Sequence, residues 1–347
     1  MPNVQENPHR GRGLLRDTPR PRNDARHVAA LLANCPRHAE TPLINAQGLA
    51  ERVGVASVWV KDERERMGLG SFKALGAAFV IARDATDAGG PFETALADRI
   101  YVAASAGNHG MSVAAGARIF GAKAIIYLAE SVPEAFAKRL IATGAEVVRA
   151  GAQYEDSMAA AMQDAEANGW TLLSDSTWDG YLGPAMGVME GYLQMANEAI
   201  RQIGVPPTHI LLQAGVGGLA ASVAAAARKA WGDAPKILVV EPEWAPALQA
   251  SIAAGALVTT DGPVSEMGRL DCKTASLVAL RGLSEDADLF VTITEEEAAE
   301  GVGILEKYGL ATTPSGGAGL AAILAGLPDM PSDARVLAIL SEGPEDA

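Results

Sequence analysis

The sequence predicts an α/β protein in which a mostly parallel sheet is flanked by helices and the chain is divided between two lobes. Short apolar runs alternate with alanine-rich stretches of helical periodicity, which is the pattern of repeated βαβ units. The composition agrees, because 49% of the residues are hydrophobic and only 5% are aromatic, so Ala, Leu, Val and Ile build the core. A length of 347 residues is enough for about two domains.

The expected strands are the short apolar runs. They span residues 57–61, 99–103, 124–127, 146–149, 171–173, 209–213, 237–240 and 335–340. Helical periodicity follows most of these runs, so we expect helices to cover the sheet. The expected helices span residues 72–85, 109–120, 133–143, 154–167, 184–203, 218–230 and 295–308.

Two breaks in the pattern predict the domain organisation. A polar, glycine-containing stretch at 84–94 and a second stretch around 178–184 look like two crossings between lobes. We therefore expect a small substrate-side domain, residues 86–185, inserted in a large cofactor-binding domain made of residues 1–85 and 186–347. Within the large domain, the arginine-rich residues 1–26 are expected to form an irregular arm, for which a partner subunit is one surface to pack on.

Charge and cysteine content exclude several classes of protein. A net charge of -14 argues against a nucleic-acid or anionic membrane partner, because binding phosphates needs clustered Lys and Arg. Cys35 and Cys272 form no metal or disulfide spacing, so we expect no metal site and a reducing compartment. Neither a membrane-spanning apolar run nor a secretory signal is visible, and the expected location is the cytoplasm.

The turn Ser71-Phe72-Lys73 opens a stretch of helical periodicity with a lone lysine. An ammonium group carried into a largely apolar pocket loses hydration, its pKa falls, and the neutral amine can form a Schiff base with an aldehyde. Taken alone, a solvated lysine at a helix start is the simpler interpretation. Three later motifs favour the functional one.

The second motif, residues 105–109, lies between an expected strand and an expected helix. Its small residues leave backbone N–H groups uncovered at a helix N-terminus, which suits the binding of a carboxylate. Asn108 adds an amide that can reach a phenolic or carbonyl oxygen. His109 is better explained by a local hydrogen bond than by catalysis, and an ordinary strand-to-helix turn remains the alternative for the whole motif.

The third motif is a glycine-rich turn between an expected strand and a helix. It comprises Gly215, Val216, Gly217, Gly218 and Leu219. Glycines let the backbone approach a phosphate, and the helix N-terminus helps to hold it. The turn also matches the G-x-G-x-x-A fingerprint of dinucleotide-binding proteins, with Glu241 at the end of the next strand as a ribose-binding acid, so a nicotinamide-dependent dehydrogenase is a rival interpretation.

The fourth motif, Pro314-Ser315-Gly316-Gly317, precedes an apolar helical run near the C-terminus. Ser315 is either a helix cap or a hydroxyl that faces a ring nitrogen.

Together the four motifs resemble the tryptophan-synthase-β-like, or fold type II, pyridoxal-phosphate enzymes, in the same order across most of the chain. Residues 61–63, 175–181, 240–242 and 267–272 look most like those of diaminopropionate ammonia-lyases, whereas residues 105–109 look like those of threonine and serine dehydratases. The resemblance implies two open twisted, mostly parallel sheets flanked by helices, pyridoxal 5'-phosphate as cofactor, and a homodimer.

The resemblance also implies a role for each motif. Lys73 would form the Schiff base, Phe72 would lie beside the ring, and Asn108 would lie near its phenolic oxygen. Ser315 would meet the pyridine nitrogen, where a neutral hydroxyl favours elimination of a β-substituent over transamination. The cofactor phosphate would be held by Gly215, Val216, Gly217, Gly218 and Leu219. The substrate carboxylate would be held by Ser105, Ala106, Gly107 and His109.

One residue departs from the resemblance. Diaminopropionate ammonia-lyases typically carry an Asp, a base for one face of the substrate, at the position of Ala106. Asp175, the base for the other face, is retained, with a turn or helix cap as its alternative role. An acid on one face only predicts a preference for L-amino acids.

These observations predict a carbon–nitrogen lyase that removes a β-substituent from an L-amino acid such as L-2,3-diaminopropionate and yields a 2-oxo acid and ammonia. Serine, threonine or hydroxyaspartate dehydration is the nearest alternative. A β-replacement synthase, the dehydrogenase and a non-catalytic pyridoxal-phosphate-binding protein are less favoured.

Overall fold

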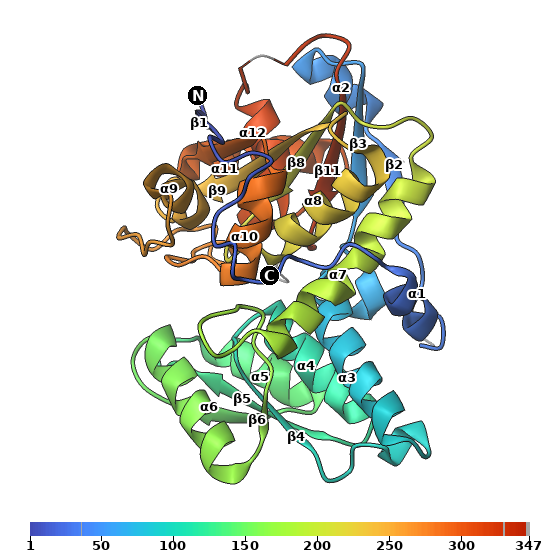
Figure 1. Ribbon diagram of the computed structural model, residues 1–347, viewed down its shortest axis with the longest axis vertical. Coiled ribbons are helices and arrows are strands. Elements are labelled where there is room, and N and C mark those ends of the chain that lie inside the picture. The colour runs from blue at the N-terminus through green and yellow to red at the C-terminus, as the bar shows by residue number, and fades with distance from the viewer. Residues whose placement is uncertain (36, 329, 345–347) are drawn as a thin grey trace.

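The computed structural model describes residues 1–35, 37–328 and 330–344, which form two lobes stacked along the long axis (Figure 1). The larger lobe is built on a seven-stranded sheet of order β1-β10-β9-β8-β11-β3-β2, and the smaller on a four-stranded sheet of order β6-β5-β4-β7. The two edge strands of the large sheet, β1 and β2, run antiparallel to their neighbours. All other neighbouring strands in the large sheet, and all strands in the small sheet, run parallel. The predicted α/β class with mostly parallel sheets is therefore confirmed.

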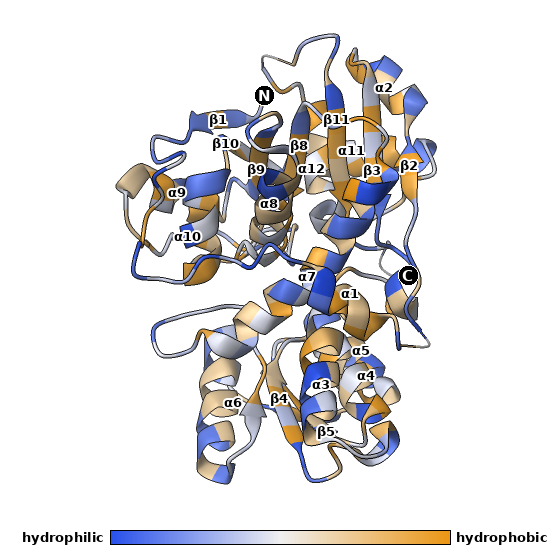
Figure 2. Ribbon diagram, turned by 45° about the vertical axis from the view of Figure 1, so that its right-hand side comes forward, coloured by the Kyte–Doolittle hydropathy of each residue, from blue (hydrophilic) through white to orange (hydrophobic). Residues whose placement is uncertain are grey.

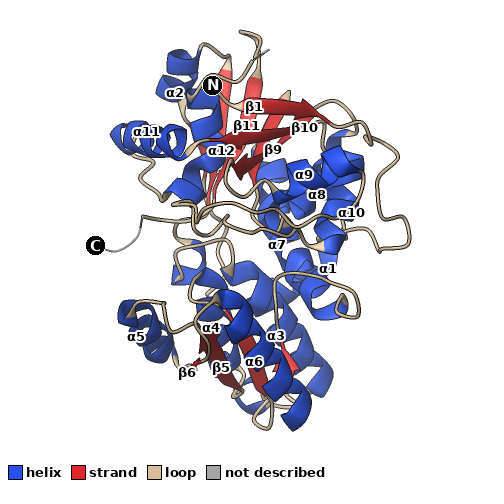
Figure 3. Ribbon diagram, turned by 90° about the vertical axis from the view of Figure 1, so that its left-hand side faces the viewer, coloured by secondary structure: helices blue, strands red, loops and turns tan. Residues whose placement is uncertain are grey.

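The strands of the large sheet are β1 (Asn3–Glu6), β2 (Leu43–Asn45), β3 (Ser57–Asp62), β8 (His209–Gln213), β9 (Lys236–Pro242), β10 (Leu289–Ile293) and β11 (Arg335–Leu340). Those of the small sheet are β4 (Ile100–Ala104), β5 (Lys123–Leu128), β6 (Glu146–Arg149) and β7 (Thr171–Leu172). Helices cover both sheets, as the blue and red elements of Figure 3 show.

The α-helices are α1 (Arg26–Leu32), α2 (Gln47–Val53), α3 (Ala74–Ala88), α4 (Asn108–Ile119), α5 (Glu134–Thr143), α6 (Tyr154–Asn168), α7 (Gly183–Gln202), α8 (Gly218–Trp231), α9 (Ala247–Ala254), α10 (Leu277–Asp286), α11 (Glu295–Lys307) and α12 (Pro314–Leu324). Short 3₁₀ turns lie at η1 (Arg66–Gly68) and η2 (Phe92–Thr94). Among the described residues, no helix combines the length and the apolar character that a membrane crossing requires.

Every expected strand and helix is present, with ends displaced by a few residues at most. Strands β1, β2 and β10 and helices α1, α2, α9 and α10 were not predicted. The edge strands are only four and three residues long, so their extended form comes from pairing with β10 and β3 rather than from a long apolar run of their own. The central strands are mainly in hydrophobic colours (Figure 2), which agrees with their burial.

The N-terminal arm, predicted to be irregular, contains strand β1. It crosses the large lobe toward α1 as the dark-blue ribbon of Figure 1. Its arginines form ion pairs with acidic side chains of the same chain. The pairs are Arg10 with Asp233 and Asp288, Arg20 with Glu285 and Asp286, and Arg22 with Glu190. Strand pairing and these ion pairs hold the arm against its own chain.

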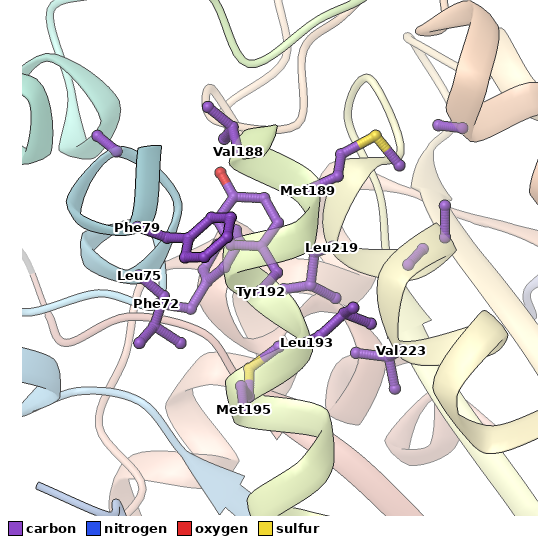
Figure 4. Close-up of a cluster of buried hydrophobic side chains, with 14 of the residues drawn as sticks. Phe72, Leu75, Phe79, Val188, Met189, Tyr192, Leu193, Met195, Leu219 and Val223 are labelled. Carbon is purple, nitrogen blue, oxygen red and sulfur yellow. The ribbon is translucent and has the colours of Figure 1, made fainter. Parts of the chain in front are cut away.

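Helices α3 and α7 cross at two glycines, and this crossing fixes the start of α3. A Cβ atom on Gly191 would lie 2.5 Å from the carbonyl oxygen of Leu75, and one on Gly76 would lie 2.6 Å from Val188. The helices therefore pack backbone to backbone beside the buried cluster of Figure 4. Helix α3 also packs on α4 and so contacts both lobes; the division at residue 85 remains a prediction.

Candidate active site

The candidate site lies at the carboxyl ends of three adjacent strands of the large sheet, β8, β11 and β3, and faces β4 of the small sheet. Ligands bind at such ends in open α/β sheets, because the loops that follow parallel strands meet there. The Phe72 N–H donates to the carbonyl oxygen of Ser341 at 3.0 Å, which ties the lysine turn to the end of β11. The structure thus brings the predicted motifs of both lobes toward one region.

Lys73 is the residue directly before α3, and its ammonium group forms an ion pair with Asp175. Burial alone would lower the pKa of Lys73, but the carboxylate of Asp175 outweighs it and raises that pKa above its usual value. Burial acts to raise the pKa of Asp175, and the Lys73 ammonium lowers it below its usual range. The expectation of a neutral lysine is therefore wrong for this state of the protein, because the lysine has a charged partner.

The loop that carries Asp175 is tied to the large lobe by two buried hydroxyl groups. The oxygens of Thr177 and Ser276 lie 2.6 Å apart, and the Val278 N–H donates to Thr177 at 2.9 Å. The Ser276 N–H donates to the carbonyl oxygen of Val216 at 3.0 Å. Asp175 and the glycine-rich turn are therefore linked through a short chain of hydrogen bonds.

The turn at residues 105–109 joins β4 to α4, as predicted. The ring nitrogen Nε2 of His109 lies 2.8 Å from the carbonyl oxygen of Leu173, and burial lowers the pKa of His109, so the ring is neutral and donates this bond. The side chain thus makes a local hydrogen bond, as expected. Backbone N–H groups at the start of α4 remain the proposed carboxylate site, and the methyl group of Ala106 carries no titratable function beside them.

The glycine-rich turn leaves β8 and opens α8, with Gly217 as N-cap in the left-handed conformation (φ +97°) that favours glycine. A Cβ atom on Gly215 would lie 3.0 Å from the Cys272 sulfur, so the turn has no room for a side chain there. A turn of bare backbone at the start of a helix is typical of sites that bind phosphate through N–H groups.

The ring of Phe72, the residue before Lys73, packs on the ring of Tyr192 with 4.8 Å between the ring centres, close to Leu219 (Figure 4).

Glu241 does not behave as a ribose-binding acid. Its carboxylate is fully buried and accepts the Leu248 N–H at 2.7 Å and the Gln249 N–H at 2.8 Å, at the start of α9. Burial raises the pKa of Glu241 to about 8, and the two backbone donors oppose that rise. Because this side chain holds the start of α9, it is not available to bind a ribose. The dinucleotide interpretation then rests on the G-x-G-x-x-A turn alone.

Ser315 is not the cap of α12. Thr313 takes that role, since its hydroxyl accepts the Gly316 N–H at 2.9 Å. The Ser315 oxygen accepts the backbone N–H of Arg269 at 3.1 Å, so its own hydrogen points elsewhere. The hydroxyl therefore remains free to donate, and its role toward a ring nitrogen stays a prediction.

Four residues near these motifs were not predicted as site residues: Tyr192, Arg269, Cys272 and Glu342. The Tyr192 hydroxyl is buried and has no hydrogen-bond partner among the described residues. Burial raises the pKa of Cys272 to about 12, so the thiol is neutral. Glu342 lies two residues beyond the end of the last strand, and the rule that sites lie after parallel strands is the sequence signal that could have identified it.

These groups fit pyridoxal phosphate. The glycine turn at the start of α8 has no side chains that would exclude a phosphate, and the Ser315 hydroxyl has a hydrogen to donate. The buried Tyr192 phenol has no hydrogen-bond partner among the described residues. The fold and the site together define a pyridoxal-phosphate-binding enzyme. A family model described as "Pyridoxal-phosphate dependent enzyme" matches residues 35–342, and the chain belongs to this family.

Curated relatives narrow the class. The chain is 32% identical over 340 residues to diaminopropionate ammonia-lyase of Escherichia coli strain K12, a match that covers 88% of this chain and 85% of that protein. It is 30% identical over 294 residues to a human serine dehydratase-like protein, covering 84% of each chain.

Solved structures agree. The crystal structure of Escherichia coli diaminopropionate ammonia-lyase in complex with D-serine matches with a TM-score of 0.88 at 28% identity, covering 99% of this chain and 94% of that chain. The predicted family resemblance, fold type II, the pyridoxal-phosphate cofactor and the class of ammonia-lyase are confirmed.

Proposed function

We propose that the chain eliminates the β-amino group of L-2,3-diaminopropionate and yields a 2-oxo acid and ammonia. The observation that carries the proposal is the Lys73–Asp175 ion pair, because both turns approach it. A Cβ atom on Gly218 of the glycine-rich turn would lie 3.9 Å from the carbonyl oxygen of Asp175, and the charges of Asp175 and Lys73 both act on His109 of the other turn. The names of the relatives support the substrate class.

In the proposed site, Lys73 would hold the aldehyde group of pyridoxal phosphate and Asn108 would donate to its phenolic oxygen. Ser315 would donate to the ring nitrogen, and Phe72 would pack beside the ring. The phosphate would be held by Gly215, Val216, Gly217, Gly218 and Leu219. When bound, the cofactor supplies an electron-accepting ring that makes the α-proton of an amino acid acidic.

The proton transfers are assigned to Lys73 and Asp175. Once Lys73 no longer faces Asp175 as a free ammonium group, the pKa of Asp175 rises in the direction that its burial favours. The carboxyl group can then hold a proton and deliver it to the departing amine, or accept the α-proton. The N–H groups of residues 105–109 orient the substrate carboxylate meanwhile.

Ala106 supports selectivity for the L-isomer, because it has no group to move a proton on the second face of the substrate. The same turn supports the second candidate function, dehydration of serine, threonine or a hydroxyaspartate. The match to serine dehydratase-like proteins favours that candidate over β-replacement.

We also propose a cytoplasmic homodimer. The cysteine content supports a reducing compartment, and the resemblance to fold type II enzymes supports the dimer. Sedimentation of the holoenzyme tests the oligomeric state: a mass of one chain would contradict the dimer.

A substrate panel tests the reaction. The purified holoenzyme is incubated with L- and D-diaminopropionate, L-serine, L-threonine and a hydroxyaspartate, and both ammonia and 2-oxo acid are measured. We expect the highest kcat/KM for L-diaminopropionate and no turnover by the matched Lys73→Ala variant. A higher value for a hydroxy amino acid would assign the chain to the dehydratases, and no keto acid from any substrate would refute the proposed function.

A further inference from the structure

Glu342 is a buried carboxylate inside the site to which the proposed reaction gives no role. It lies two residues beyond the end of β11 and forms an isolated bridge with Ser71, in the lysine turn. Only 4% of its surface is exposed. A carboxylate at this depth requires several partners, because burial without them is costly.

The two carboxylate oxygens of Glu342 have different partners. One accepts a hydrogen bond from the side-chain amide of Asn108. The other accepts from the Thr313 hydroxyl and lies 2.9 Å from the guanidinium group of Arg269. Burial raises the pKa of Glu342, and Arg269 and the two donors oppose that rise.

The position of Glu342 is fixed on its other side by the start of α12. Its carbonyl oxygen accepts from the Thr312 hydroxyl at 2.6 Å, and a Cβ atom on Gly316 would lie 2.8 Å from its Cγ. Backbone and side chain are therefore both held in place. The side chain acts as a rigid part of the site.

A carboxylate can only accept hydrogen bonds, whereas an Asn amide carries two donor hydrogens on its nitrogen and an acceptor oxygen. Glu342 therefore selects the orientation in which the amide nitrogen of Asn108 faces it. The second hydrogen on that nitrogen is left for another acceptor, and the repulsive amide oxygen is turned away.

We propose that Glu342 is a positioning residue that orients the Asn108 amide so that its second N–H faces the phenolic oxygen of pyridoxal phosphate. The inference rests on the placement of Asn108 in the proposed function. It gives a purpose to a buried side chain held among Asn108, Thr313 and Arg269. Asn108 acts on the cofactor, and Glu342 acts through Asn108.

The Glu342→Gln variant tests this role, because a Gln side chain can present either a donor or an acceptor to Asn108. An Asn108 oxygen turned toward the phenolic oxygen disfavours its negative form. We expect the holoenzyme to lose part of its yellow absorption band and gain near-ultraviolet absorption. The dissociation constant for pyridoxal phosphate, measured by adding it to apoprotein, should rise about tenfold, as the loss of one well-placed hydrogen bond predicts.

A double-mutant comparison tests whether Glu342 acts through Asn108. Asn108→Ala should shift the bands in the same direction, and adding Glu342→Gln to Asn108→Ala should shift them no further. If the Glu342→Gln variant does not fold, Glu342→Asp serves in its place, because it withdraws the carboxylate from Asn108 by one methylene. The same changes in absorption and cofactor affinity are expected for it. Glu241, a buried carboxylate that accepts from Leu248 and Gln249 and shares no partner with Glu342, supplies the matched control: Glu241→Gln should leave the bands unchanged.

Unchanged bands and cofactor affinity in both Glu342 variants would overturn the inference while the role of Asn108 stands. Additive effects in the double variant would also overturn it, because Glu342 would then act by another route. Unchanged bands in Asn108→Ala would instead refute the proposed placement of Asn108, and the inference with it.

Discussion

Lys73 and Asp175 keep each other charged. The ammonium lowers the pKa of the carboxylate, and the carboxylate raises that of the lysine. In the proposed function, each group becomes available as acid or base only once a ligand separates the pair. Binding of substrate and cofactor would therefore activate both groups together.

Asp175→Asn should reduce turnover of the L-isomer by about a hundredfold or more, the loss expected when a general acid or base is removed. The amide keeps the shape but cannot move a proton, so the yellow colour of the holoenzyme should persist. Steady-state assays with an absorption spectrum check both parts. Full activity would show that another group, with Lys73 first, moves the proton.

Ala106→Asp supplies the missing acid on the opposite face. Some turnover of D-diaminopropionate should appear in this variant, with the L-activity largely kept. Assays of both enantiomers with each protein provide the test. Equal wild-type rates on the two isomers would contradict the assignment of one acid to one face.

Ser315→Asp should keep the ring nitrogen protonated, because a carboxylate stabilises the positive charge that a hydroxyl does not. We expect a long-wavelength absorbing species to accumulate during turnover and elimination to slow. Stopped-flow spectra with substrate would detect it. A spectrum and rate like those of the unmodified protein would assign Ser315 to local structure alone.

At the residue scale, the sequence could identify the groups whose local pattern carries the chemistry. Lys73, Asn108 and Gly217 stand in turns that precede helices, and the four motifs together with the family resemblance marked them. Glu342 and Tyr192 were missed because their surroundings arise only when distant segments meet. Position after a strand is a weak signal for Glu342, and a phenol within a helix has no local signature.

At the scale of elements, the loop between β7 and α7 connects the two lobes through the Thr177–Ser276 pair. Both side chains are almost fully buried, and the pair reaches the backbone of the glycine-rich turn. The pair therefore links the backbone of that turn to the loop that carries Asp175.

Thr177→Val keeps the shape of the side chain but leaves the Val278 N–H and the Ser276 hydroxyl without this partner. Unfolding should become easier by about 1–3 kcal/mol, the cost of unsatisfied buried groups. With Asp175 misplaced, kcat should fall by about tenfold to a hundredfold while KM changes little.

Urea unfolding and steady-state kinetics measure the two effects. Thr177→Ser, which retains the hydroxyl, is the control and should recover most of kcat. Equal rates in the Val variant and the unmodified protein would show that the pair has no influence on Asp175.

Element prediction succeeded where apolar runs and helical periodicity alternate, and it failed at the sheet edges. β1 and β2 owe their structure to the strands beside them, which lie far away in sequence. Strand β10 was also missed, but its apolar run, Leu289–Ile293, could have been recognised from the sequence alone.

At the scale of the whole molecule, a buried charge network joins β3, η1 and α7. Glu198, fully buried, lies 2.8 Å from Lys61 Nζ and 2.7 Å from Arg66 Nη2, and Glu63 pairs with the same arginine. Burial acts to raise the pKa of Glu198, but Arg66 and Lys61 outweigh it and lower the pKa to about 2. The network supports the segment that leads into the lysine turn.

Glu198→Gln should destabilise the protein by about 3–5 kcal/mol at neutral pH, because it leaves two buried cations with one carboxylate. The folded pKa lies below the ordinary value of 4.5, so the contribution is complete above pH 4.5 and fades as the pH falls toward 2. Urea unfolding at several pH values should show the difference between variant and unmodified protein shrinking in acid. A difference that does not change with pH would contradict the linkage.

Strand β11 is the last strand in the chain and yet lies in the interior of the large sheet, between β8 and β3. On the ribosome, the small sheet, with all of its strands between residues 100 and 172, can close long before β11 emerges. The two flanks of the large sheet must wait for that strand to insert between them. Catalytic competence is thus conferred in one late folding event, and a chain that terminates ahead of residue 335 would keep an ordered small lobe with no place for the reaction.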